Sequence, residues 1–165
     1  MEELLGLGAK VGVVGIGATL ILDFWSLFLK AAFGVPSPNY KMVGRWIGYF
    51  TRGRFVHRAV ADAPRIGGEH LIGWSAHYGI GILYAGLLVA FAGADWLNTP
   101  TVLPAMLVGI MTVAAPFLMM QPAMGAGFAS SKAERPNIAR MRSLAAHAAF
   151  GFGLYLAAVI VRSVT

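Results

Sequence analysis

Four long apolar stretches constrain this chain more than any other feature of its sequence. They cover residues 11–29, 70–94, 103–120 and 143–161. The apolar core of a bilayer is about 30 Å thick and takes about 20 helical residues to cross, so each stretch is long enough to span it. Of the 165 residues, 58% are hydrophobic and only 12% are charged, which is unusual for a soluble domain. The sequence therefore predicts an all-α, polytopic membrane four-helix bundle forming one integral domain over residues 1–165.

The basic residues predict how the spans are oriented. One lysine or arginine precedes the first span, seven lie in the loop 30–69, none lies between the second and third spans, four lie in the loop 121–142, and one follows the last span. Because basic loops remain on the cytoplasmic side, both basic loops are predicted to be cytoplasmic and both termini periplasmic. The basic residues behind the net charge of +6 are therefore interpreted as signals of membrane orientation and as contacts with the lipid bilayer. No nucleic acid is expected as a partner.

The first loop combines apolar residues at helical spacing with arginines. Residues 41–60 are predicted to form an amphipathic helix in the membrane interface. The side chains expected to contact lipid headgroups are Arg45, Trp46, Arg52, Arg54 and Arg58. An irregular loop held by headgroups is the alternative.

The second and fourth spans share a pattern that indicates an internal repeat. A histidine is followed four residues later by glycine and then by tyrosine, in His77, Gly81 and Tyr84 and again in His147, Gly151 and Tyr155. The first and third spans show a weaker echo, in Gly15 with Thr19 and Gly109 with Thr112. The pattern predicts two tandem helical hairpins. Chance similarity between glycine-rich apolar helices is the competing explanation.

Ionisable residues from three spans are predicted to lie at one depth. With a helical rise of 1.5 Å per residue, Asp23, His77 and His147 lie roughly 7–11 Å inside the same membrane boundary. Glu69, His70 and Gln121 form a more superficial layer on that side. Charged groups in a membrane are normally paired or face a cavity, so Asp23 is expected to contact one of the two deeper histidines or an arginine such as Arg45.

Several chemistries suit this set of residues. Two histidines could ligate haem b, with His77 and His147 as axial ligands and Gly81 and Gly151 leaving room for the macrocycle. A divalent metal could instead be held among His70, His77, His147, Glu69 and Asp23. A proton relay and a hydrogen-bonded latch between helices without any ligand are the other possibilities. The chain has no cysteine, which excludes thiolate ligands and a cysteine nucleophile.

Two function classes follow from these possibilities. In the leading one, the polar set binds a redox cofactor, an ion or a proton. In the alternative, the chain is a non-catalytic membrane subunit that docks a partner or a second copy of itself. Both favour a homo-oligomer or a subunit of a membrane complex, and the sequence does not establish whether the chain is an enzyme.

Glycines and prolines predict local features of the spans. Gly8 and Gly12 are expected to allow close helix packing. Pro116 is expected to kink the third span, and Gln121 with Pro122 to end it.

Short motifs along nearly the whole chain carry a family resemblance. They are Val43-Gly44-Arg45-Trp46, Gly68-Glu69, His77-Tyr78, Gln121-Pro122-Ala123-Met124-Gly125 and residues 143–147. With these motifs the chain resembles a bacterial family of small four-helix inner-membrane proteins that is catalogued as a domain of unknown function. The resemblance implies a four-span fold in the bacterial cytoplasmic membrane, and it implies no activity.

Overall fold

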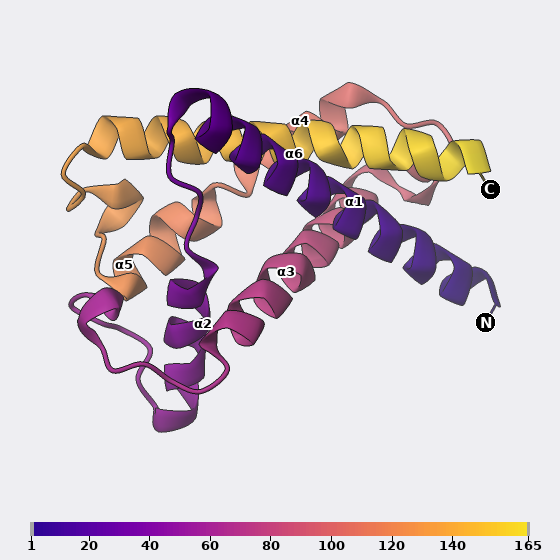
Figure 1. The fold of residues 1–165 in the computed structure, drawn as a ribbon. Helices are drawn as coiled ribbons and strands as arrows, with labels where there is room; N and C mark the ends of the chain where they lie inside the picture. Colours follow the sequence, from indigo (N-terminus) through magenta and orange to yellow (C-terminus); the bar gives the residue numbers. More distant parts are fainter. Residues whose placement is uncertain (1, 165) are drawn as a thin grey trace. The chain divides into compact units, whose positions relative to one another are not determined.

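The computed structural model describes residues 2–164 and contains only helices and loops in that range (Figure 1). The α-helices that contribute to the spans are α1 (Glu2–Phe33), α3 (Glu69–Ala92), α4 (Val102–Met111), α5 (Gln121–Met124) and α6 (Pro136–Val164). Shorter elements lie between them: α2 (Tyr40–Gly48), η1 (Tyr49–Arg52), η2 (Val60–Asp62), η3 (Ala94–Leu97), η4 (Pro116–Met120) and η5 (Phe128–Ser130). The predicted all-α class is confirmed.

Four helical segments are long and apolar enough to cross a membrane. They are Leu5–Phe33, Glu69–Ala92, Val102–Met124 and Pro136–Val164. Each contains or closely matches one predicted stretch, and the first and last extend several residues beyond it because the flanking residues continue the helix. The chain is therefore a multi-pass membrane protein.

The third span changes its helical form along its length. α4 ends at Met111, and the span continues through the π-helical segment η4, which begins at Pro116. Proline lacks an N–H and prevents the regular α-helical bond, so a change of helix type at this position is expected. The prediction that Gln121 and Pro122 end the span is wrong. Pro122 lies in the first turn of α5, where its missing N–H is tolerated, and the helix ends only at Gly125, which has a φ of 96°.

The predicted interfacial helix is only partly present. α2 begins after Asn39, whose side chain accepts a hydrogen bond from the Lys41 backbone N–H at 3.2 Å. The helix continues as the 3-10 turn η1, and Gly53 stops it with a φ of 66°. The rest of the predicted range, up to residue 59, is not helical. The apolar spacing indicated the helix correctly but not the glycine that ends it.

The described chain divides into two compact units. Unit 1 comprises residues 2–37, 78–112 and 145–164, and unit 2 comprises residues 38–77 and 113–144. The helices of unit 1 come from all four spans and share a buried apolar core that includes Val14, Ala18, Leu88, Phe150 and Leu154.

Glycines bring the helices of unit 1 into backbone contact. A Cβ atom on Gly15 of α1 would lie 2.5 Å from the Ile82 Cα of α3. In the same way, a Cβ on Gly151 of α6 would lie 2.9 Å from the Ala105 carbonyl oxygen of α4 and 3.2 Å from the Gly109 Cα. These two contacts pair the first span with the second and the third with the fourth at the positions where the sequence repeats, while Gly17 and Gly153 bring the first and fourth spans together. This correspondence supports two tandem hairpins.

Two other glycines of α1 do not make such contacts. Nothing lies within 4 Å of a Cβ atom placed on Gly8 or on Gly12. The prediction that these two positions allow close helix packing is therefore wrong for the described chain, because no neighbouring helix comes within contact distance of α1 at either glycine.

Candidate functional site

An ion pair between Arg45 and Glu69 organises unit 2. The Arg45 Nε donates to one Glu69 carboxylate oxygen at 2.8 Å and its Nη2 donates to the other at 3.0 Å. The Arg45 Nη1 donates to the carbonyl oxygens of Ala61 and Ala63, each at 3.0 Å. The two side chains are only 5% and 13% exposed. The hydrogen bond to Glu69 raises the pKa of Arg45 above its usual value, and burial acts in the opposite direction.

Glycines allow α2 and α3 to approach closely enough for this pair. A Cβ on Gly44 would overlap the Glu69 carbonyl oxygen, and a Cβ on Gly73 would overlap the Tyr40 carbonyl oxygen. The helix that carries Arg45 is thereby held directly against the start of α3. Arg45 was expected at the membrane surface with the headgroup-binding residues, but the pair with Glu69 places its side chain inside unit 2. Arg52, Arg54 and Arg58 are exposed, as the headgroup prediction requires.

His77 and His70 lie among aromatic rings in unit 2. The His77 ring stacks on Tyr40 with centroids 4.1 Å apart and meets the Trp74 ring at 5.7 Å in an edge-on arrangement. The Trp74 Nε1 donates a hydrogen bond to the His70 Nε2 at 3.1 Å. The regular spacing along the second span indicated that these residues share one face, and the aromatic contacts are consistent with that. Tyr40 was not among the predicted site residues.

Asp23 and His147 lie in unit 1, each next to a hydroxyl group. The Tyr78 hydroxyl donates to Asp23 at 3.0 Å. The His147 Nδ1 lies 3.0 Å from the Thr112 Oγ1 and 3.3 Å from the Gly109 carbonyl oxygen, and the Thr112 hydroxyl itself donates to that carbonyl at 2.6 Å.

The structure does not assemble the predicted residues into one metal centre. Within residues 2–164, no group of three or more histidine, aspartate or glutamate side chains is placed to hold a metal ion. The space next to the two glycines is also filled, since Gly81 faces the Thr19 side chain and Gly151 faces the α4 backbone. A haem macrocycle lying against these glycines would overlap the neighbouring helices, so the predicted haem arrangement does not fit there.

The sequence did not predict which residues form hydrogen bonds with the ionisable side chains. Arg45 is 24 positions from Glu69, and nothing in the local spacing joins them. Both do lie in motifs that support the family resemblance, and each of these motifs also contains a glycine. The presence of Arg45 and Glu69 in these motifs is the sequence signal that singles out both residues.

His57 is buried in unit 2 with its ring nitrogens unpaired. It is 2% exposed, and among the described residues neither ring nitrogen has a hydrogen-bond partner. Its ring packs edge-on against Tyr49 with centroids 4.9 Å apart, and its backbone N–H donates to the Ala123 carbonyl oxygen at 2.7 Å. Burial, and secondly the positive charge of Arg54, lower the pKa of His57 below its ordinary value of 6.5.

This lowered pKa predicts a pH-dependent stability. Well above pH 6.5 His57 is neutral in the folded and unfolded states, and the stability is at its full value. As the pH falls below 6.5 the unfolded chain takes up a proton that the folded chain resists, so the folded state loses stability down to the folded-state pKa. The unfolding temperature of the protein in detergent should fall between pH 7 and pH 5 by more than that of His57→Phe. Identical pH profiles for the two proteins would contradict this.

Comparison with known proteins assigns the chain to a family. Residues 12–161 match the model of a family described as "Protein of unknown function (DUF2938)". The chain belongs to this family. The match includes most or all of each span and parts of both units, so the resemblance seen in the motifs is confirmed. No curated protein and no solved structure matches the chain.

Proposed function

We propose that this DUF2938 member is a non-catalytic membrane subunit in which ionisable side chains fasten the helices together. The bidentate pair of Arg45 and Glu69 is the main support, because every nitrogen of the guanidinium donates to a protein oxygen. The hydrogen bonds of Asp23 with Tyr78 and of His147 with Thr112 likewise join an ionisable side chain to a residue far away in the sequence. Groups that are satisfied by neighbouring helices serve as latches without any added ligand.

The partner of such a subunit is a second copy of the chain or another membrane protein. In the most apolar window of each span, only 17–39% of the residues are buried within the chain. A large apolar surface is thus left for lipid or for another protein. Light scattering of the full-length protein in nanodiscs is expected to give the mass of a dimer, a larger oligomer or a complex. A single chain per nanodisc at every protein concentration, with no co-purified protein, would contradict the proposal.

The cellular placement is proposed on the distribution of charge. We infer a bacterial inner membrane with both termini periplasmic, supported by eleven of the thirteen basic residues lying in the two loops that would be cytoplasmic, seven in the first and four in the third. Alkaline phosphatase, which is active only outside the cytoplasm, should be active when fused to the C-terminus. If the phosphatase fusion is inactive and green fluorescent protein fused at the same position is fluorescent, the C-terminus lies in the cytoplasm, which would contradict the proposed orientation.

A second candidate function, an ion or proton site, rests on the tautomer of His147. Because the Thr112 hydroxyl donates to the Gly109 carbonyl, the oxygens near the His147 Nδ1 can only accept from it. The ring proton is therefore assigned to Nδ1, which leaves the lone pair on Nε2. A histidine oriented in this way through Nδ1 is common among ligands and proton acceptors. A proton flux into liposomes that His147→Gln abolishes and Thr112→Val retains in part would favour this candidate, and equal fluxes in all three proteins would exclude it.

A further inference from the structure

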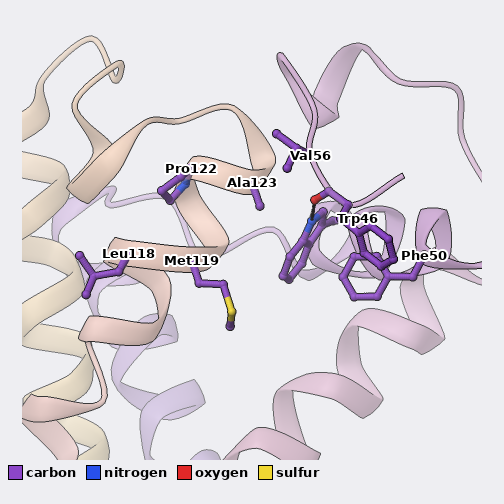
Figure 2. A pocket seen from close by; sticks show the side chains of 8 residues that line it. Trp46, Phe50, Val56, Leu118, Met119, Pro122 and Ala123 are labelled. Carbon is purple, nitrogen blue, oxygen red and sulfur yellow. Dashed lines mark hydrogen bonds between the residues drawn. The ribbon is translucent and has the colours of Figure 1, made fainter. Parts of the chain in front are cut away.

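An apolar pocket of about 560 Å³ lies in unit 2. One wall consists of Trp46, Phe50, Phe55 and Val56, and the other of side chains between residues 118 and 123 (Figure 2). In Figure 2 the Met119 side chain extends from η4 into the space in front of Trp46. The pocket therefore lies between the loop that follows the first span and the end of the third span.

The side chains that line the pocket offer no free polar group. The polar side-chain atom among the lining residues is the indole Nε1 of Trp46, which already donates to the Phe55 carbonyl oxygen at 2.7 Å. The aromatic rings on this wall pack together, with centroids 4.9 Å apart for Trp46 and Phe50 and 5.0 Å apart for Phe50 and Phe55. A molecule that enters the pocket can gain only apolar contacts there, so the entering part is a hydrocarbon.

Two arginines lie next to pocket-lining residues in the sequence. Arg54 directly precedes Phe55, and Arg58 follows Val56 by two residues. Both arginines are exposed, and the guanidinium carbon of Arg54 lies 5.7 Å from the centroid of the Tyr49 ring. No acidic residue occurs between positions 46 and 61. The complementary ligand therefore carries a negative charge next to its hydrocarbon part.

The position of the pocket at the end of a span identifies the kind of ligand. Met119 belongs to the last part of the span Val102–Met124, where the apolar core of a bilayer gives way to headgroups. An arginine-bearing loop beside such a span end meets anionic headgroups and the first part of their acyl chains. We propose that the pocket binds one acyl chain of an anionic phospholipid, with the lipid phosphate held by Arg54 and Arg58.

Native mass spectrometry of the full-length protein tests this proposal. The detergent-solubilised protein is incubated with phosphatidylglycerol or with phosphatidylcholine of the same acyl chains, and the retained lipid is counted. We expect phosphatidylglycerol to be retained roughly 25-fold more strongly, because each of the two arginines near an anionic headgroup favours binding by about fivefold. Equal retention of the two lipids, or retention of neither, would overturn the proposal.

Two pairs of variants measure separately how the pocket and the arginine charges contribute to lipid retention. Met119→Trp fills the pocket and should lower phosphatidylglycerol retention about tenfold, whereas Met111→Trp, at another exposed methionine of the same span, should not. The double variant Arg54→Gln/Arg58→Gln should reduce the retention of phosphatidylglycerol to that of phosphatidylcholine. Arg135→Gln should leave the retention of phosphatidylglycerol unchanged. Displacement of the lipid by inorganic phosphate alone would show that the acyl chain contributes nothing, which would contradict the assignment.

Discussion

Replacing Glu69 with glutamine is expected to lower the unfolding temperature of the protein in detergent by roughly 5–10 °C. The substitution leaves the Arg45 guanidinium in its buried position, opposite an amide that can accept a hydrogen bond through only one of its two polar atoms. A buried charge that loses its counter-ion is far more costly than an exposed one. Thermal unfolding of the purified variant, followed by loss of monodisperse protein on size-exclusion chromatography, measures the effect.

Two further proteins make this prediction specific. Asp62→Asn removes an exposed acid from the same loop and should change the unfolding temperature little. The double variant Arg45→Met/Glu69→Met removes both charges together, and it should recover much of the loss because no unpaired charge remains. If Glu69→Gln were as stable as Asp62→Asn, the ion pair would not be holding α2 against α3.

Replacing Gly15 with alanine is expected to have a comparably large effect on unit 1. The added methyl would meet backbone atoms of α3, at 2.5 Å from the Ile82 Cα and 2.9 Å from the Gly81 carbonyl oxygen, and backbone cannot move aside as a flexible side chain can. The two helices must separate, so the unfolding temperature should drop by roughly 5 °C or more. Alanine is the better helix former by about 1 kcal/mol, so any loss reports the packing and not the helix itself.

Gly12→Ala supplies the matched control in the same helix, almost one turn earlier. A Cβ at that position meets nothing within 4 Å, so this variant should be as stable as the original protein or more stable. Equal behaviour of the two alanine variants would mean that the close approach at Gly15 does not exist in the membrane.

The fold was largely predictable because membrane insertion is governed by local composition. Each span is recognised from its own 20 or so residues, without knowledge of what it contacts. Helix ends and breaks were less predictable. Gly53 and Gly125 end their helices through a left-handed backbone conformation, and whether a glycine adopts it depends on the structure around it. Gly12 and Gly15 look alike in sequence, and only the position of α3 distinguishes them.

The candidate site was less predictable than the fold. Helical rise gave comparable depths for Asp23, His77 and His147, but depth along the membrane normal does not determine which side chains meet. The partners, such as Tyr78 for Asp23 and Thr112 for His147, depend on helix rotation and on pairings between residues 35 to 55 positions apart. The Arg45–Glu69 pair likewise required the fold of the first loop.

The most direct test of the latch proposal is the cofactor content of the protein purified from its native membrane. The absorption spectrum and elemental analysis of the same sample are measured together, for the original protein and for His77→Ala, His147→Ala and Thr112→Val. If the ionisable groups are latches, we expect no Soret band and no metal in stoichiometric amount, together with lower unfolding temperatures for His147→Ala and Thr112→Val. A Soret band, or one metal ion per chain, that disappears in His77→Ala or His147→Ala but persists in Thr112→Val would contradict the proposal.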